Sequence, residues 1–563
     1  MKRLVALALV LSAGLMIPRA LADAEEKNPV TTQAVDANEL AVTDPVPLIE
    51  LRTASGALFW TLSNREAENA VANHGMAWQH TRLGYLRRQS FPGSQPIFRL
   101  RYPAGTAYLL TASVEERDAL VASGDWVYEG VTGYAWAEQV EGTEVLWRMS
   151  RNATWRVVPD DRRAEYEAAG WQLDGPLGYV YPTYHRAGAI YFGTWNADGN
   201  QALLDNAEWV YGRRDWWAGV RDFAGTDVPR NAWHWEDEDF SHLEPSIGYY
   251  DDSDPRTLEK HIAQAASAGL DHFAFYWYWN PADGGSENYE EGLRAFLQAR
   301  NRADLDFTIM PCLHPWSNAD VSLRLPEDQI EKAASVIVDE YLSQPNYLRA
   351  NDGRKVLTIC DPRGIGSGDA NSVDTAAVRA FTDAIRAKAW EAFGEDVLIT
   401  LNTDVGMDVA AGGFDGRQCQ GRWDTTRSYR HYVDNERQYF ANHSGILIRC
   451  VTSGFDERPR IGILIPDPEE PTEENLKAAF RWYDDQSPEE FGRLLDLVAA
   501  DIAESTRPQI VDNMVLIYAW NEWHEGGVIE PNARDGCRYL DMIRERLSLH
   551  TGTGCVENPE LPA

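Results

Sequence analysis

The stretch that decides the fold lies near the end of the chain. It reads Met514-Val515-Leu516-Ile517-Tyr518-Ala519-Trp520, followed by Asn521-Glu522-Trp523-His524-Glu525-Gly526-Gly527-Val528-Ile529-Glu530-Pro531. The first part is a short apolar run, which predicts a buried strand. The second part is polar and contains two glycines, which predicts a loop. The segment therefore predicts a strand that delivers two glutamates, Glu522 and Glu525, to its carboxyl end.

Similar apolar runs precede this strand and alternate with amphipathic helical stretches, the βα pattern of a parallel sheet. The candidate strands are residues 189–192, 272–277, 307–310, 356–359, 397–401, 413–419, 446–451 and 514–518. Helix starts are readable at Asp254-Pro255 and at Ser487-Pro488-Glu489-Glu490, and the first of these helices should stop at Gly269. Eight strands predict an α/β fold of the (β/α)₈ TIM-barrel type, whose chemistry sits where strands end.

Three related blocks occupy residues 46–182, ahead of the barrel. Each carries two short apolar runs, a glutamate, a tryptophan and a Gly-Tyr pair, at an interval of roughly 45 to 50 residues. This threefold repeat predicts an all-β domain, a closed β-trefoil, and it resembles a trefoil-type repeat domain of unknown function appended to secreted bacterial enzymes. Carbohydrate binding is one hypothesis, with Tyr85, Tyr134 and Tyr179 as ring platforms; core packing of these side chains is the alternative.

The first residues have the pattern of an export signal. Lys2 and Arg3 precede an apolar run from Leu4 to Ile17, and Ala20-Leu21-Ala22 has the small residues of a cleavage site. Residues 1–22 are therefore predicted to be a signal peptide, with an uncleaved anchor as the alternative, and residues 23–45 a flexible linker. Because no later apolar stretch reaches about eighteen residues, we expect a secreted or periplasmic protein without a membrane span after cleavage.

The composition excludes some partners. The chain has 87 Asp and Glu against 52 Lys and Arg, a formal charge of −35, so the surface should repel nucleic acid. The 21 Trp and 24 Tyr suit stacking on sugar rings, although core packing accounts for most of them. We expect a monomer that binds a polysaccharide or oligosaccharide.

The six cysteines show no paired spacing of the kind that binds zinc. The sequence thus predicts no metal and no cofactor. In an exported chain, Cys537 could pair with Cys555 and Cys312 with Cys360. Buried free thiols are the alternative.

Glycosidic cleavage requires a pair of carboxyl groups such as Glu522 and Glu525. One protonates the departing oxygen while the other assists at the anomeric carbon, and a separation of about 5 to 5.5 Å predicts retention. The rings of Trp520 and Trp523 are expected to stack on sugar and to raise the pKa of one glutamate. Taken alone, two glutamates at this spacing also fit the start of a surface helix.

The wider string around this pair resembles a known signature. Trp520-Asn521-Glu522-Trp523-His524-Glu525-Gly526 with Glu530-Pro531 is similar to the W-N-E-W-x-E-G…E-P pattern of glycoside hydrolase family 99 and its WbsX-like relatives. The resemblance spans residues 187–548 and leaves 549–563 as a tail. It implies a retaining hydrolysis in which Glu522 is a base on the sugar's 2-hydroxyl and Glu525 is the acid and then the base. An enzyme-bound ester on Glu522 is the ordinary alternative.

One position departs from that signature, because Gly527 stands where the family's hydrolases usually have threonine. The mannoside specificity of the best-known members is therefore not inherited. Residues that follow the predicted strands or lie in the last loop are expected to bind substrate: Tyr250, Tyr276, Trp277, Trp279, His314, Trp316, Asn402, Asn521, Trp523 and Glu530. By strand alternation, half of the aromatic residues at 276–279 should instead be packing. Asp456, Arg458 and Arg460 are expected to form a salt bridge that holds a loop.

Two rival functions remain. WbsX-like proteins have often been described as glycosyltransferases of surface-polysaccharide assembly, although export separates this chain from cytoplasmic nucleotide sugars and no glycine-rich phosphate loop follows a strand. The second rival is a protein that binds carbohydrate without cleaving it.

Overall fold

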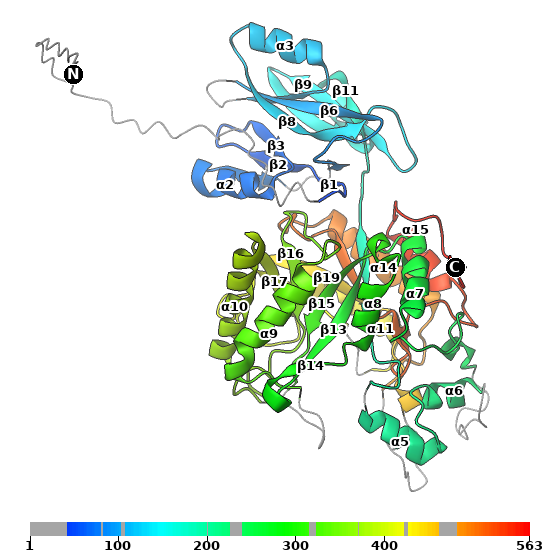
Figure 1. Cartoon of the computed structure of the whole chain (residues 1–563). Coiled ribbons are helices and arrows are strands. Elements are labelled where there is room, and N and C mark those ends of the chain that lie inside the picture. Colours follow the sequence, from blue (N-terminus) through cyan, green and yellow to red (C-terminus); the bar gives the residue numbers. More distant parts are fainter. Residues whose placement is uncertain are drawn as a thin grey trace, which may run out of the picture.

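The computed structural model describes residues 42–79, 83–102, 107–199, 201–225, 239–314, 323–369, 371–421, 426–460 and 481–562. A smaller N-terminal domain lies over one end of a larger barrel (Figure 1). The predicted signal peptide and most of the predicted linker lie outside the described residues. No helix within these ranges is both long and apolar enough to cross a membrane.

Each repeat of the N-terminal domain folds as two strands, a helix and a further strand. The first contains β2 (Ile49–Arg52), β3 (Leu58–Thr61), α2 (Asn64–His74) and β4 (Ala77–Gln79), with β1 (Val46–Pro47) paired to β5 (Tyr85–Leu86). The second contains β6 (Ser94–Arg101), β7 (Tyr108–Thr111), α3 (Val114–Ala122) and β8 (Val127–Trp136). The third contains β9 (Glu144–Arg151), β10 (Thr154–Pro159), α4 (Arg163–Ala168) and β11 (Gln172–Val180).

The threefold repeat is present, but the structure does not show the predicted β-trefoil. A helix stands between the second and third strands of each repeat. In the first two repeats a serine caps the start of this helix, whereas α4 follows the short helical turn η1 (Asp160–Arg162). Ser63 Oγ accepts from Glu66 N at 3.0 Å, and Ser113 Oγ accepts from Glu116 N at 3.1 Å. The strands form a six-stranded sheet, β10-β9-β11-β8-β6-β7, and a separate three-stranded sheet, β3-β2-β4.

The three tyrosines considered as sugar platforms lie where the repeats meet. Tyr85 is bridged to Tyr181, Tyr134 to Arg87, and Tyr179 to Trp136. All three are half-buried. Their backbones therefore join one repeat to the next.

Buried arginines also connect successive repeats. Arg99 of the second repeat binds Glu66 of the first at 2.6 Å and Glu129 at 2.9 Å. Arg148 of the third repeat binds Glu116 of the second at 2.7 Å. The helices of the first two repeats thus present a glutamate in their first turn to the following repeat.

Eight parallel strands form the barrel, all at the predicted places. They are β12 (Arg186–Tyr191), β13 (His272–Asn280), β15 (Asp306–Pro311), β16 (Lys355–Ile359), β17 (Val397–Asn402), β18 (Gly416–Gln418), β19 (Ile446–Thr452) and β20 (Met514–Tyr518). Ladders join them in the order β15-β13-β12-β20-β19-β18-β17-β16. Ala189 is the register partner of both Phe273 and Ile517. The first and last strands are therefore neighbours, as a barrel requires.

The β15–β16 seam is joined by isolated bridges and by a disulfide. Cys312 is bridged to Asp361 and bonded to Cys360, with a Cα–Cα distance of 4.7 Å. A second disulfide, Cys419–Cys450, joins the β18 and β19 region, and a third, Cys537–Cys555, fastens the C-terminal tail. The predicted pairings Cys312–Cys360 and Cys537–Cys555 are both present, whereas Cys419–Cys450 was not predicted.

Helices cover the outside of the barrel (Figure 1). They are α7 (Pro255–Ala268), α8 (Glu291–Gln298), α9 (Ile330–Val336), α10 (Thr375–Phe393), α11 (Tyr429–Ala441), α14 (Pro488–Ala503) and α15 (Arg538–Arg546). The predicted ends of α7 are confirmed: Asp254 accepts from Arg256 N at 2.9 Å, and Gly269 has the left-handed φ of 91°. Ser487 caps α14 as expected.

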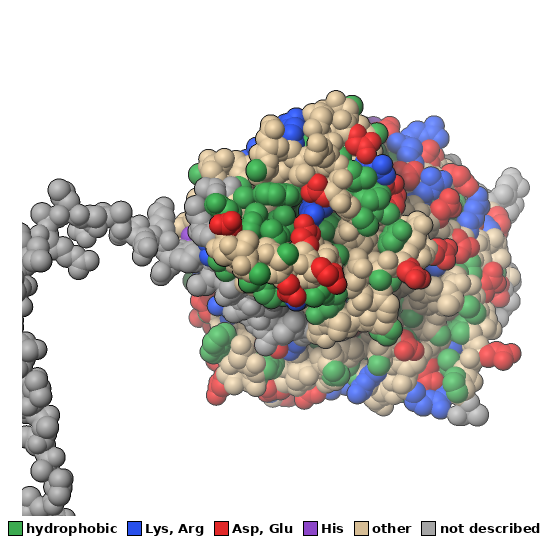
Figure 2. All heavy atoms as spheres, turned by 90° about the horizontal axis from the view of Figure 1, so that it is seen from above, with side chains coloured by type: hydrophobic (Ala, Val, Ile, Leu, Met, Phe, Trp, Pro, Cys, Tyr) green, Lys and Arg blue, Asp and Glu red, His purple; other side chains and the backbone are tan. Residues whose placement is uncertain are grey.

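The N-terminal domain packs against the amino ends of the barrel strands. Arg88 donates to the backbone oxygens of Leu62, in the first repeat, and Asn351, in the loop before β16, at 2.6 and 2.7 Å. At the C-terminal tail, His550 stacks on Tyr181 with ring centroids 4.0 Å apart. The outer part of the domain exposes Tyr102 and Tyr128 by 40% and 37%, and the view from above shows hydrophobic and acidic side chains intermixed (Figure 2).

Candidate active site

A cavity of about 1150 Å³ opens at the carboxyl ends of the barrel strands. Each of the eight strands, or the loop that follows it, contributes to its wall: Phe192, Tyr276, Tyr278, Cys312, His314, Cys360, Asp361, Asn402, Asp404, Gln420, Arg460, Tyr518, Glu522 and Glu525. This is the end of a barrel at which catalytic side chains gather. The N-terminal domain packs on the opposite end and lies away from this wall.

The last loop brings both glutamates to the cavity through a tight hairpin. β21 (Asn521–Glu522) pairs with β22 (Gly527–Val528), so that Glu522 is opposite Gly527. The Asn521 side chain fixes the start of the hairpin, because it accepts from Phe192 N at 2.8 Å and donates to Phe192 O at 3.0 Å. The loop is thereby tied to the end of β12.

The two glycines of this hairpin have a steric reason. Gly526 has a left-handed φ of 63°, and a Cβ there would come within 2.7 Å of Asp456 Cβ. A Cβ on Gly527 would collide with the ring of Tyr518. Gly527 therefore stands in place of the family's usual threonine at a position where the ring of Tyr518 occupies the space that a side chain would need.

Glu522 lies in a site that favours its protonated form. It is 4% exposed, and its Oε2 has no hydrogen-bond partner among the described residues. Burial raises the pKa of Glu522 well above its usual range, and the charge of Glu525 raises it further, while Arg460 acts in the opposite direction. A carboxyl group in these surroundings can hold a proton at neutral pH.

Glu525 has different surroundings, although it is only three residues away. Arg460 Nη1 lies 2.6 Å from Glu525 Oε1, and the hydroxyl of Tyr518 donates to Oε2. Each of these two groups offers a donor to one carboxyl oxygen of Glu525. The pair therefore combines one carboxyl without a partner and one that is bound by two donors.

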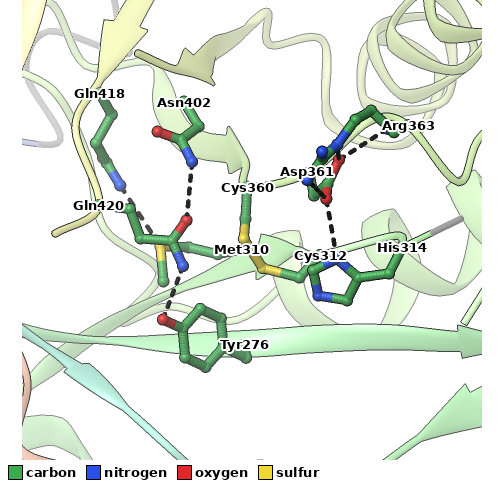
Figure 3. The surroundings of a disulfide bond; sticks show 10 residues. All are labelled: Tyr276, Met310, Cys312, His314, Cys360, Asp361, Arg363, Asn402, Gln418 and Gln420. Atoms are coloured by element: carbon green, nitrogen blue, oxygen red, sulfur yellow. Dashed lines mark hydrogen bonds and ion pairs between the residues drawn. A yellow bond between two sulfur atoms is a disulfide. The ribbon is translucent and has the colours of Figure 1, made fainter. Parts of the chain in front are cut away.

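Polar contacts line the wall on both sides of the Cys312–Cys360 disulfide (Figure 3). On one side, Asn402 donates to Gln420 at 3.1 Å and Gln420 donates to the Tyr276 hydroxyl at 2.7 Å. Because the Tyr276 hydroxyl accepts this bond, its own proton can be donated to a group in the cavity.

On the other side, Asp361 connects His314 and Arg363, at 2.9 and 2.6 Å (Figure 3). Burial raises the pKa of Asp361, but hydrogen bonds from these two residues outweigh it, and the pKa lies below its usual range. Asp361 thus holds both side chains at the cavity wall as an ionised carboxylate.

Of the residues expected to bind substrate, Tyr276, His314 and Asn402 line the cavity. Trp316 lies outside the described residues. Trp277 and Trp279 point to the outer side of β13, where they donate to Glu287 and Gln329 at 2.7 Å. They do not line the cavity, because alternation along the strand turns Tyr276 and Tyr278 inward instead.

Four further residues that were expected to bind substrate lie in a buried network behind the hairpin: Tyr250, Asn521, Trp523 and Glu530. The Tyr250 hydroxyl donates to Glu530 at 2.9 Å and accepts from Trp523 Nε1 at 3.1 Å. Glu530 also contacts His261 at 3.1 Å. Because Asn521, Trp523 and Glu530 are 0% exposed, these residues anchor the loop and do not line the cavity.

The tryptophans of the last segment do not form the expected stacking surface. Trp520 is 0% exposed and packs on Phe273, with ring centroids 5.1 Å apart. Trp523 belongs to an aromatic cluster with residues of the β12–α7 insertion, which also carries α5 (Gln201–Tyr211) and α6 (Ala218–Ala224). The aromatic rings that line the cavity include those of Phe192, Tyr276, Tyr278, Tyr289 and Tyr518.

The same insertion supports the back of the hairpin. Trp195 and Trp216 pack on His524, with ring centroids 4.8 and 5.4 Å away. Burial and, to a smaller extent, the charge of Arg460 lower the pKa of His524 to about 3. His524 is therefore a neutral packing residue at physiological pH.

Arg460 and Tyr518 are site residues that the sequence did not assign. The expected salt bridge is divided: Arg458 binds Asp456 at 2.7 Å, whereas Arg460 turns to Glu525. Tyr518 is the last residue of β20, a position that could have been read as facing the cavity. Within the described residues, no group of three or more His, Cys, Asp or Glu side chains is placed to hold a metal ion.

In this chain, eight parallel strands end at a cavity that contains a pair of carboxyl groups. This is the arrangement of a (β/α)₈ protein with an enzyme-like site. The family model described as "Glycosyltransferase WbsX" matches residues 214–543, and the chain belongs to this family. The WbsX-like resemblance of the last loop is thereby confirmed. A second model, for a domain of unknown function (DUF5648), matches residues 50–181.

Among curated proteins, the chain is similar to the uncharacterized protein WxcX of Xanthomonas campestris pv. campestris, with 27% identity over 362 residues, 59% of this chain and 47% of the relative. The chain thus spans about half the length of the curated relatives it matches. Among solved structures, a GH99 endo-alpha-mannosidase from Bacteroides thetaiotaomicron has 18% identity and a TM-score of 0.39, covering 64% of this chain and 95% of that one. A glycoside hydrolase-like protein has 14% identity and a TM-score of 0.40, covering 65% and 94%.

Proposed function

We propose that the protein hydrolyses a glycosidic bond in a polysaccharide or oligosaccharide. The observation that carries this proposal is the pair Glu522 and Glu525 on one cavity wall, with one carboxyl buried without a partner and the other bound by Arg460 and Tyr518. Glycoside cleavage uses two carboxyl groups whose surroundings differ from each other. The size of the cavity, above the usual range for small-molecule pockets, supports an extended substrate.

The resemblance supplies a mechanism for the pair. Glu522 takes the proton of the sugar's 2-hydroxyl, and this oxygen displaces the leaving group at the anomeric carbon. Glu525 gives its proton to the departing oxygen and then, as a base, takes one from the water that opens the internal ring. Glu522 returns its proton to the 2-oxygen in this second step, so that the 2-hydroxyl is restored and the configuration is retained. An oxygen held in line within the substrate is an effective nucleophile. In the alternative, Glu522 itself attacks and forms an ester.

The second candidate is glycosyl transfer, favoured by the description of the family. The two reactions differ in the acceptor, which is water in hydrolysis and a sugar hydroxyl in transfer. Three disulfides support a protein that works in an oxidising compartment. We therefore propose a secreted or periplasmic hydrolase, away from cytoplasmic nucleotide-sugar donors.

The test is a panel of bacterial and plant polysaccharides incubated with the parent and with Glu525→Gln. We expect the parent to release reducing sugar from at least one of them and the variant to lose this activity. Proton NMR of the first product should give the anomeric configuration of the substrate. Sugar binding without release of product by the parent would favour a binding protein, and product only in the presence of a nucleotide sugar would favour a transferase.

For residues 46–182 we propose an accessory role in carbohydrate binding. This domain lies away from the cavity of the barrel, which supports a separate carbohydrate-binding site. Exposed rings such as those of Tyr102 and Tyr128 are available for stacking on sugar. A chain without residues 46–182 should be retained less by an insoluble polysaccharide than the full chain. Equal retention would remove this proposal.

A further inference from the structure

Arg460 occupies a position that the proposed mechanism does not explain. It ends the short helical turn η7 (Arg458–Arg460), and its neighbour Arg458 is already bound to Asp456. The side chain of Arg460 reaches into the cavity and binds Glu525 Oε1 at 2.6 Å. The mechanism requires Glu525 to carry a proton, whereas this contact stabilises Glu525 without one.

The charged and titratable groups around the pair come from four parts of the barrel. Tyr518 on β20 donates to Glu525, and Tyr276 and Tyr278 on β13 face both glutamates. Glu457, in the loop after β19, faces Arg460 and Glu525. His524 is neutral.

Among these groups, Arg460 is the cation closest to the pair. The carboxyl of Glu522 is buried, lacks a hydrogen-bond partner at Oε2 and is influenced by both Glu525 and Arg460. Two interacting carboxyl groups titrate as a unit, so a positive charge fixed on one of them decides where a single shared proton resides. Burial raises the pKa of Glu522, and the charge of Glu525 raises it further.

We propose that Arg460 controls the location of the one proton that Glu522 and Glu525 share, and that substrate must separate the guanidinium from Glu525 before this glutamate can act as the acid. This inference rests on the proposed glycoside hydrolysis. When the guanidinium leaves Oε1, the proton on Glu522 becomes free to pass to Glu525. Glu522 is then the carboxylate that accepts the 2-hydroxyl proton, and both groups reach the states that the reaction needs. Arg460 is thus a positioning residue for the proton and needs no contact with the bond that breaks.

The first test is the pH profile of kcat/KM for the parent, Arg460→Met and Arg460→Lys. Loss of the cation should move both limbs of the profile to higher pH, by about 1 to 2 pH units, because a nearby positive charge favours ionised carboxylates. Arg460→Lys keeps the positive charge, so its pH profile should lie close to that of the parent. Arg481→Met removes the same charge from an exposed side chain near Glu457 and should leave the profile in place. An Arg460→Met profile that coincides with that of the parent would overturn the inference.

The second test needs no substrate and therefore remains informative if the protein does not cleave sugar. In a Glu522→Gln background, Glu525 is the remaining member of the pair, and its carboxyl can be followed by infrared difference spectroscopy against the Glu522→Gln/Glu525→Gln double variant. We expect the titration midpoint of Glu525 to be about 1 to 3 pH units higher when Arg460→Met is added. Equal midpoints would contradict the proposal, whereas inactivity of the parent on every sugar would contradict only the proposed function.

Discussion

The two faces of the last loop use similar residues for different purposes. The cavity face consists of Tyr518, Glu522 and Glu525, and the buried face consists of Asn521, Trp523 and Glu530. On the buried face, Glu530 is bound by Tyr250 and His261 and is fully enclosed. On the cavity face, Glu522 keeps an oxygen without a partner. A glutamate in an aromatic setting is therefore a structural anchor where its hydrogen bonds are satisfied and a candidate for chemistry where they are not.

The largest effect on stability should come from the ring at the centre of the buried face. Trp523→Ala removes a fully buried side chain from the aromatic cluster of the insertion and should lower the free energy of unfolding by about 3–5 kcal/mol. Urea denaturation measures this loss. Tyr278→Ala removes a ring from the cavity wall instead and should cost less. Equal losses in the two variants would mean that the two faces do not differ in packing.

A smaller effect is expected from the hydroxyl that connects the buried face. Tyr250→Phe removes the donor to Glu530 and the acceptor of Trp523 Nε1, and leaving buried groups without partners should cost about 1–3 kcal/mol. Tyr276→Phe removes a hydroxyl from the cavity wall and serves as the matched control. The distinction fails if Tyr276→Phe destabilises the fold as much as Tyr250→Phe.

The smallest expected effect concerns the pH dependence of stability on the cavity face. Burial raises the pKa of Glu522 in the folded state, so the stability associated with its protonated form is complete below the unfolded pKa and is lost as the pH rises through the folded pKa. Glu522→Gln cannot ionise. Its free energy of unfolding relative to the parent should therefore increase between pH 5 and pH 8, by on the order of 1 kcal/mol. A pH-independent difference would show that Glu522 is not held in its protonated form.

Much of the fold follows from local patterns in the sequence. Most of the barrel strands are largely apolar runs, because both faces of a parallel sheet are covered, whereas β18 reads Gly416-Arg417-Gln418. The caps Asp254 and Ser487 and the stop at Gly269 depend only on neighbouring residues, and the structure has all three. The repeat of the N-terminal domain was also readable, but the helix after Ser63 was not, because that segment has no strong apolar stripe.

The site was harder to predict, since burial is decided by distant elements. Tyr276 and Trp277 are equally aromatic, and only the register of β13 turns one inward and the other outward. Glu530 resembles Glu525 in the sequence, but Tyr250 and His261 enclose it from elements about 270 residues away along the chain. Arg460 was expected to join Asp456, yet the partner it binds belongs to another loop. These pairings depend on the assembled barrel and leave no signal in a single segment.

The central claim is that Glu525 acts in the reaction while Glu530 holds the loop. Its most direct test measures kcat/KM and the free energy of unfolding side by side for Glu525→Gln and Glu530→Gln, on a polysaccharide that the parent cleaves. We predict that Glu525→Gln loses about 10²- to 10⁴-fold in kcat/KM with an unfolding free energy close to that of the parent, whereas Glu530→Gln is mainly destabilised. A folded Glu525→Gln protein with the activity of the parent would contradict the account.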